Sequence, residues 1–218
     1  MTRTQAVVNF LHETMYQELA TTLHKILSFE SISVDRRSVL QPLIDFIALK
    51  LEQNSPINLN FICTHNSRRS HLSQIWAQVA AFYYKTENVY CYSGGTEETE
   101  LFPKIAETLN NQGFNVFQIS EGKNPVYAIK YAENEQPIIG FSKKYDHIFN
   151  TSSQFCAIMT CSHADGGCPF IAGAEKRIPI TYEDPKIADG TPFQDEMYTA
   201  RSIQIANEMF YVFSQLKK

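Results

Sequence analysis

The chain has 218 residues, of which 44% are hydrophobic and 19% are charged, a composition typical of a folded globular protein. Nineteen basic residues stand against 23 acidic ones, and the net charge of −4 argues against a nucleic-acid-binding protein, which needs a basic face. The sequence contains neither a membrane-spanning apolar run nor a signal peptide, so we expect a cytoplasmic protein without membrane partners. The five cysteines are an odd number, which favours reduced thiols over a disulfide framework.

Residues 1–55 are predicted to form a helical N-terminal extension. Apolar residues recur at helical spacing between Val7 and Leu27, and again between Val39 and Leu51, with a polar stretch between the two groups. Pro42 is expected near the start of the second helix, where its missing N–H costs least. The segment contains no catalytic grouping, so we expect it to serve packing or to form the contact of a homodimer.

Residues 56–218 alternate between strand and helix patterns. Apolar strands are predicted near residues 57–64, 88–96, 155–161 and 176–180, and amphipathic helical stretches lie between them and at 193–216. This alternation predicts an α/β fold, a three-layer sandwich in which helices cover both faces of a four-stranded parallel sheet. Residues 126–145 read as a β-hairpin inserted into that plan, with its turn at 132–137.

The stretch of residues 63–70 carries the strongest chemical signal. Cys63 ends a buried strand, five residues intervene, and Arg69 opens a helix. Loops at the carboxyl ends of parallel strands bind ligands, and backbone N–H groups that precede a helix can surround a tetrahedral oxyanion. Arg69 can bind two oxygens of such an anion, and the positive surroundings favour the Cys63 thiolate. The alternative is a buried cysteine followed by an exposed basic helix start.

The residues after Cys63 are the candidate oxyanion-binding set. Ser70 can donate to the sulfur, and the Asn66 amide can fix the loop. The set is Thr64, His65, Asn66, Ser67, Arg68, Arg69 and Ser70.

The sequence of this loop, CTHNSRRS, resembles the C-x-G-N-x-C-R-S loop of the low-molecular-weight protein tyrosine phosphatases and their arsenate reductase relatives. Two positions depart from that pattern, because His65 replaces a glycine and Arg68 replaces a second cysteine. The resemblance covers about residues 57–216, including the SGGTE stretch at 93–97, but not the first 55 residues or the hairpin. It implies a catalytic domain at 56–218 in which Cys63 is the nucleophile and arsenate or phosphate is the oxyanion.

Asp184 is the candidate general acid. The resemblance implies this role, because in this family an Asp-Pro pair on a loop protonates the leaving oxygen, and Asp184-Pro185 is the matching pair. The same two residues also fit a helix N-cap followed by proline at the first helical position. Both roles can hold together.

Cys161 and Cys168 distinguish the branches of the family. The surrounding run, MTCSHADGGCPFIAGA, is most similar to the thioredoxin-coupled arsenate reductases. That resemblance implies a relay in which Cys63 attacks arsenate, Cys161 attacks Cys63 to release arsenite, and Cys168 forms the final disulfide with Cys161. Thioredoxin would then reduce this disulfide. Gly166 and Gly167 would let the intervening segment unwind.

Several other interpretations compete with this relay. Cys156, Cys161, His163 and Cys168 contain enough ligands for zinc, but they lack a short C-x2-C spacing, so we expect neither a metal nor a cofactor. Cys91 and Cys156 lie within apolar strands and are expected to be inert. A phosphatase that acts on phosphotyrosine or small phosphoesters would need only Cys63, Arg69 and Asp184. A binding module could hold an oxyanion without turnover.

Overall fold

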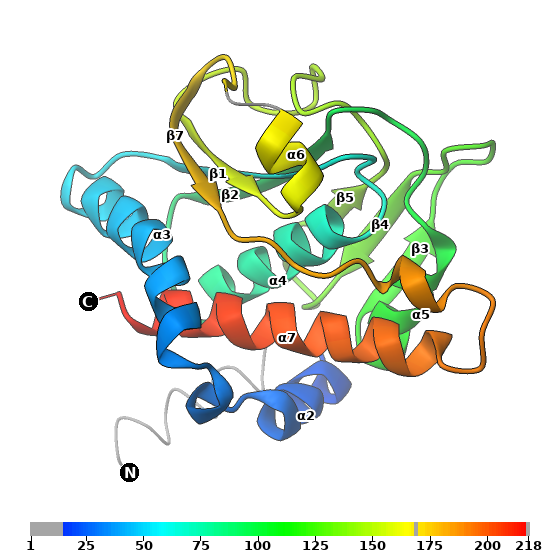
Figure 1. Ribbon diagram of the computed structural model, residues 1–218. Coiled ribbons are helices and arrows are strands. Elements are labelled where there is room, and N and C mark those ends of the chain that lie inside the picture. Colours follow the sequence, from blue (N-terminus) through cyan, green and yellow to red (C-terminus); the bar gives the residue numbers. More distant parts are fainter. Residues whose placement is uncertain (1–14, 168–169, 217–218) are drawn as a thin grey trace, which may run out of the picture.

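The computed structural model describes residues 15–167 and 170–216 (Figure 1). Its main sheet is parallel throughout and has the strand order β2-β1-β6-β7. The strands are β1 (Ile57–Cys63), β2 (Val89–Gly95), β6 (Phe155–Met159) and β7 (Ala174–Pro179). All four lie where the alternating apolar pattern predicts them, and the expected four-stranded parallel sheet is confirmed.

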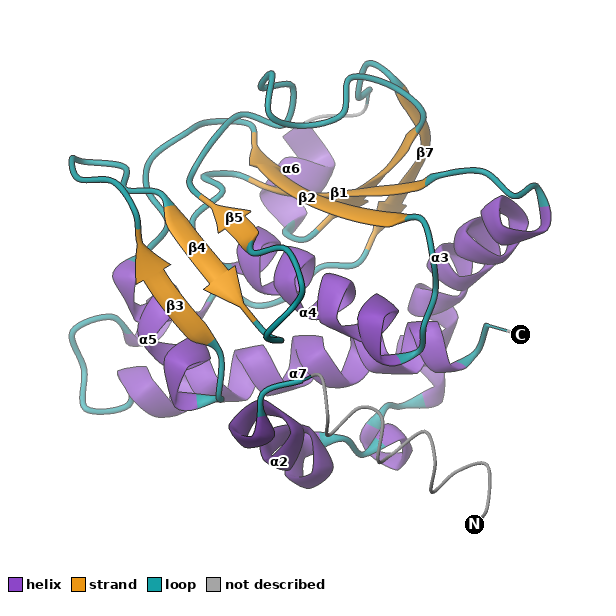
Figure 2. Cartoon of the chain, turned by 180° about the vertical axis from the view of Figure 1, so that it is seen from behind, coloured by secondary structure: helices purple, strands orange, loops and turns teal. Residues whose placement is uncertain are grey.

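Helices lie on both faces of this sheet, as predicted (Figures 1 and 2). One face packs on α4 (Arg69–Tyr83) and, beyond it, α7 (Gln194–Ser214), while α6 (Ser162–Gly167) covers β1 and β6 from the other face. The helix α5 (Pro103–Asn111) packs against α7. The fold is therefore the three-layer α/β sandwich expected from the sequence.

The N-terminal segment contains two α-helices, α2 (Gln17–Ile26) and α3 (Val34–Glu52), joined through a short 3-10 turn, η1 (Phe29–Ser31). The helix α3 begins earlier than predicted, because the Ser33 hydroxyl caps it by accepting from the Arg36 N–H at 3.2 Å. Pro42 consequently lies in the interior of α3, so its expected place near the helix start is wrong.

A second, three-stranded antiparallel sheet lies beside the main one (Figure 2). The predicted hairpin is confirmed as β4 (Tyr127–Lys130) and β5 (Ile138–Gly140), which pair around the expected turn. A third strand, β3 (Asn115–Gln118), pairs with β4 from its other side. Sequence periodicity did not identify β3, because its four residues are mostly exposed and show no clear apolar alternation.

Two hydrophobic clusters lie on opposite sides of the main sheet. The larger contains buried residues of α2, α3, α4 and α7, so the N-terminal helices share one continuous core with the α/β part of the chain. The smaller cluster lies under α6 and contains both Cys63 and Cys161. The nucleophile candidate and the second thiol are thus buried in the same apolar environment.

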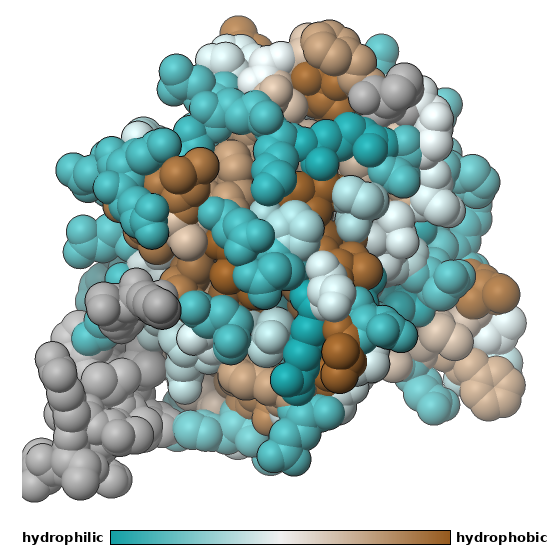
Figure 3. All heavy atoms as spheres, turned by 60° about the vertical axis from the view of Figure 1, so that its left-hand side comes forward, coloured by the Kyte–Doolittle hydropathy of each residue, from teal (hydrophilic) through white to brown (hydrophobic). Residues whose placement is uncertain are grey.

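The outer face of α3 leaves Val34 and Leu49 exposed. On the face of the molecule seen in Figure 3, apolar side chains are interspersed with hydrophilic ones. Within residues 15–167 and 170–216, no helix has the length and apolar character needed to cross a bilayer.

The packing of α3 predicts a contrast between two neighbouring side chains. Leu40 is fully buried, and its replacement by alanine should lower the free energy of unfolding by about 2–5 kcal/mol, since it removes packed atoms from the core. Val39 is 38% exposed, and Val39→Ala should cost less than about 1 kcal/mol. Urea denaturation of both variants measures the difference, and equal losses would show that α3 is not part of the core.

Candidate active site

Cys63 is the last residue of β1, and its thiol contacts the start of α4. The Cys63 Sγ lies 3.1 Å from the Ser70 Oγ, and the Asn66 Nδ2 donates to that same hydroxyl oxygen at 2.9 Å. Because Asn66 occupies the oxygen as a donor, the hydroxyl proton of Ser70 is free to point at the sulfur. Ser70 can therefore donate to a Cys63 thiolate, as the sequence predicts.

The backbone carbonyl groups of the loop accept hydrogen bonds from residues outside the loop. Thr96 N–H donates to the Cys63 oxygen at 3.1 Å, and Glu97 N–H donates to the Thr64 oxygen at 2.9 Å. The hydroxyl of Ser142 donates to the His65 oxygen at 2.8 Å. In a trans peptide the following N–H points the opposite way, so the amides of residues 64–66 face away from these donors. Successive amides that share one direction can form an anion-binding concavity, so this loop is a candidate for one.

Asn66 gives the loop its sharp bend. Its φ of 46° lies in the left-handed region, which asparagine tolerates better than most residues. The buried side chain holds that conformation, because its Oδ1 accepts from the Lys143 N–H at 2.9 Å while its Nδ2 binds Ser70. The strained position falls at Asn66, and His65, which replaces the glycine of the family pattern, does not adopt a positive φ.

Arg69, at the first position of α4, and Asp184 lie together. The Arg69 Nη2 donates to the Asp184 Oδ2 at 2.6 Å, and its Nη1 donates to the Tyr182 carbonyl at 2.9 Å. Asp184 also accepts from the Lys186 N–H at 3.1 Å and so caps the 3-10 turn η2 (Pro185–Ala188). The cap predicted from the Asp-Pro pair is present. The same side chain also contacts Arg69, the candidate oxyanion-binding arginine.

Arg68 and His65 point to other partners. The Arg68 guanidinium donates to Tyr198 Oη at 2.6 Å and to Asp189 Oδ2 at 2.7 Å, with its carbon 4.1 Å from the Phe102 ring centroid. His65 is half-exposed, and its Nε2 lies 3.5 Å from a carboxylate oxygen of Glu97. Both residues can serve an oxyanion through their backbone N–H groups, whereas their side chains fasten the loop to its surroundings.

Cys161 is buried next to the loop. Its Sγ lies 3.4 Å from the hydroxyl oxygen of Thr64, the residue that follows Cys63, and it accepts from the Ala164 N–H at 3.3 Å. The structure thus brings Cys161 to the edge of the Cys63 loop. Cys168 lies outside the described residues.

The remaining described cysteines have no such partners in the loop. Cys91 and Cys156 are buried free thiols, and burial raises the pKa of both well above the ordinary value, which keeps them protonated and inert. Among residues 15–167 and 170–216, no three His, Cys, Asp or Glu side chains are grouped so as to hold a metal ion.

Some residues of the site were not identified from the sequence. Ser142 and Lys143 follow the inserted hairpin and reach the loop only through the fold, which no local pattern signals. Sterics explain why the SGGTE stretch has glycines, because a Cβ on Gly95 would lie only 2.7 Å from the Thr64 oxygen. A Cβ on Gly94 would meet Tyr145 at 2.3 Å. The loop and its supports therefore approach each other backbone to backbone.

Two buried basic side chains lie behind the loop. Burial lowers the pKa of Lys143 to about 7, and its ammonium lies 4.5 Å from the Phe141 ring centroid. Burial and, to a lesser extent, the charge of Lys143 lower the pKa of His71 to about 3. His71 is therefore neutral at physiological pH, with its Nε2 3.2 Å from the Phe141 oxygen.

Comparison with models of known protein families gave no match, and no curated protein matched either. Similar solved structures include a low-molecular-weight phosphotyrosine phosphatase from Vibrio cholerae O395, with 12% identity, a TM-score of 0.47, and coverage of 72% of this chain and 94% of that one. An arsenate reductase from Archaeoglobus fulgidus DSM 4304 has 15% identity and a TM-score of 0.46, and the match covers 72% of this chain and 99% of that one.

An arginine phosphatase from Geobacillus stearothermophilus has 16% identity and a TM-score of 0.46, over 73% of this chain and 92% of that one. These three structures are a low-molecular-weight phosphotyrosine phosphatase, an arsenate reductase and an arginine phosphatase. At identities of 12–16%, the activity of this chain has to be inferred from its own site residues.

The burial of Lys143 predicts a pH-dependent stability. Its pKa is about 7 in the fold against 10.5 ordinarily, so between these values the unfolded chain binds one more proton. Stability should therefore rise with pH across this window, by up to about 1.4 kcal/mol per pH unit. Lys143→Met removes the charge but keeps an apolar stem, so it should stabilise the protein most at pH 7 and below. Urea denaturation from pH 6 to 10 tests this, and a parallel pH dependence in both proteins would contradict it.

Proposed function

We propose that this protein is an enzyme that forms a covalent bond between Cys63 and a tetrahedral oxyanion, and that its substrate is arsenate. The observation that carries this proposal is the placement of two buried thiols at one loop. Cys63 lies against Ser70, and Cys161 lies against Thr64 from the side of α6. A phosphatase needs only the first thiol, whereas the reduction of arsenate by thiols consumes two electrons and needs a second.

The first step is attack of the Cys63 thiolate on arsenic. The sulfur–arsenic bond forms, and one oxygen leaves as water after it receives a proton. Asp184 is the candidate donor of that proton. Its carboxyl group contacts the Arg69 guanidinium, which would bind two of the oxygens. The inward-facing amides of the loop stabilise the charge on the remaining oxygens.

The second step separates arsenite from the enzyme. The Cys161 thiolate attacks the Cys63 sulfur, and a disulfide forms as the sulfur–arsenic electron pair passes to arsenic. Arsenic is thereby reduced from the +5 to the +3 state, and the two thiols are oxidised. Cys161 Sγ is the candidate for this attack, since it contacts the residue that follows Cys63.

The third step regenerates Cys63. A Cys168 thiolate attacks Cys161, so a Cys161–Cys168 disulfide forms and Cys63 leaves as a thiolate. Gly166 and Gly167 end α6, and nothing lies within 4 Å of a Cβ placed on either, so packing does not require glycine there. Glycine destabilises a helix by about 1 kcal/mol relative to alanine, which favours unwinding of this segment. Thioredoxin is the proposed dithiol that reduces the final disulfide.

A second candidate function is hydrolysis of phosphomonoesters, and the Arg69–Asp184 pair favours it. An aryl or alkyl oxygen needs protonation as it leaves, and a carboxyl group beside the oxyanion-binding arginine is placed to supply that proton. Such hydrolysis would use Cys63 as the nucleophile and would leave Cys161 unchanged. Both reactions share the first covalent step.

Cys63→Ser should abolish both activities while the fold persists. The hydroxyl occupies the same position but is a far weaker nucleophile at neutral pH, so turnover should fall by about a thousandfold or more. Steady-state assays with arsenate and with p-nitrophenyl phosphate measure the loss, and Cys91→Ser is the matched control at a buried, inert thiol. Residual turnover above a few per cent would place the nucleophile elsewhere.

The relay predicts different defects for its two later cysteines. Cys161→Ser should form the adduct but release no arsenite, because no thiol is left to displace it. Cys168→Ser should release about one arsenite per chain and stop at the Cys63–Cys161 disulfide. Arsenite release in a single-turnover experiment and peptide mapping of the disulfides test both results. Aryl phosphate hydrolysis should survive in both variants, and unimpaired arsenate turnover in both would refute the relay.

A further inference from the structure

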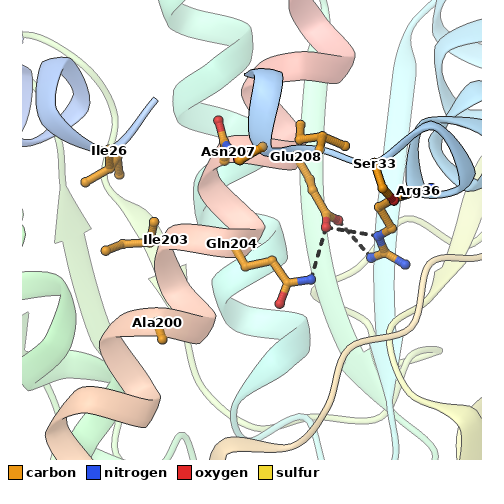
Figure 4. A pocket seen from close by; sticks show the side chains of 10 residues that line it. Ile26, Ser33, Arg36, Ala200, Ile203, Gln204, Asn207 and Glu208 are labelled. Carbon is orange, nitrogen blue, oxygen red and sulfur yellow. Dashed lines mark hydrogen bonds and ion pairs between the residues drawn. The ribbon is translucent and has the colours of Figure 1, made fainter. Parts of the chain in front are cut away.

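A partly buried ion pair joins the N-terminal segment to the last helix. Arg36 of α3 donates from Nε to Glu208 Oε1 at 2.9 Å and from Nη2 to Oε2 at 2.8 Å, a two-point contact (Figure 4). The Glu208 side chain is only 4% exposed, and Gln204 Nε2 donates to it at 3.1 Å. The pair lines a pocket of about 700 Å³ between α7 and the segment that runs from the end of α2 to the start of α3. Because desolvation offsets most of the attraction in such a pair, net stability alone does not explain its presence.

The pair lies directly on Tyr182. The guanidinium carbon of Arg36 is 4.8 Å from the centroid of the Tyr182 ring, which is within the range of a cation–π contact. Tyr182 is buried, and burial together with the negative charge of Glu208 raises the pKa of its phenol well above the ordinary value. The ring is therefore neutral and packed under a fixed cation.

The backbone of Tyr182 belongs to the active site. Its N–H donates to the Thr160 oxygen at 3.1 Å, next to Cys161, and its carbonyl accepts from Arg69 Nη1 at 2.9 Å. Two residues later, Asp184 holds the other nitrogen of the same guanidinium. A displacement of the Tyr182 ring would therefore move the carbonyl and the carboxylate that orient Arg69.

We propose that Arg36 and Glu208 are positioning residues for the oxyanion site, acting through Tyr182 on Arg69 and Asp184. This inference rests on the proposed oxyanion chemistry at Cys63, and it gives the N-terminal segment a part in that chemistry. Neither residue touches the oxyanion. Their effect is to hold two groups that do.

A second ion pair on the same helix provides the control. Lys50 of α3 pairs with Glu175 of β7, with Nζ and Oε2 2.6 Å apart, and so also links α3 to the main sheet. Within residues 15–167 and 170–216, neither Lys50 nor Glu175 forms a hydrogen bond or ion pair with Tyr182 or Arg69. Lys50→Gln therefore removes an α3 ion pair without disturbing the Tyr182 contact.

The test compares Arg36→Gln, Arg36→Lys and Lys50→Gln in the full chain. The first measurement is inhibition by inorganic phosphate, which reports binding at Arg69. The second is the ratio of kcat/KM for p-nitrophenyl phosphate to that for phenyl phosphate, which reports protonation of the leaving oxygen by Asp184. Asp184→Asn gives the ratio expected when that proton is lost.

Arg36→Gln should weaken phosphate inhibition about tenfold or more, and its ratio should shift toward that of Asp184→Asn. Arg36→Lys keeps the charge but loses the planar guanidinium and its two-point contact, so it should show an intermediate defect. If Arg36→Gln does not fold, the result for Arg36→Lys decides the question. Lys50→Gln should stay within about twofold of wild type. If wild type does not hydrolyse aryl esters, phosphate inhibition of arsenate turnover decides alone.

The role of Arg36 is overturned if a folded Arg36 variant matches wild type in both measurements, or if Lys50→Gln is equally defective. A wild-type protein that neither binds phosphate nor turns over either substrate would instead overturn the proposed function, and this role with it. Near-UV circular dichroism of each variant separates loss of fold from loss of positioning.

Discussion

The conformation of the candidate active-site loop depends on the hydrogen bonds that its backbone carbonyls accept. The oxygens of Cys63, Thr64 and His65 accept from donors outside the loop, and in a trans peptide the N–H that follows each oxygen points away from that donor. Those donors come from two places, the segment after β2 and the segment after the small antiparallel sheet. The inserted hairpin therefore supports the loop, because the segment that follows it places Ser142 and Lys143 in contact with the loop. These contacts hold the loop backbone from two segments that are distant from it in the sequence.

Much of the fold could be predicted because each strand and helix shows its own periodic spacing of apolar residues in the sequence. Strands β1, β2, β6 and β7 are apolar runs bounded by polar or glycine-rich turns, and the helices between them carry regular apolar stripes. The start of α3 was misplaced because the capping residue, Ser33, lies in a polar stretch that gives no periodic signal. Pro42 lies inside that helix, where packing against the core outweighs its local preference.

The site was predictable only in part. Cys63, Asn66, Arg69 and Ser70 were proposed from their spacing. In the structure the Ser70 hydroxyl lies between the Cys63 thiol and the Asn66 amide, whereas the Arg69 side chain binds Tyr182 and Asp184. Arg68 and Arg69 are adjacent but have different partners, and the sequence does not show which partner each one binds. Arg68 binds Asp189 and Arg69 binds Asp184, each more than 100 residues away. The contact of Arg36 with Glu208 spans 172 positions and leaves no local pattern.

The most direct test of the proposed function is the oxidation of reduced thioredoxin by the wild-type protein with arsenate present. Thioredoxin reductase and NADPH keep thioredoxin reduced, and the consumption of NADPH is followed by absorbance. The account predicts consumption that requires arsenate, this protein and thioredoxin together, with one arsenite formed for each NADPH oxidised. Hydrolysis of aryl phosphates without any arsenate-dependent NADPH consumption would contradict it, and would identify the protein as a phosphatase instead.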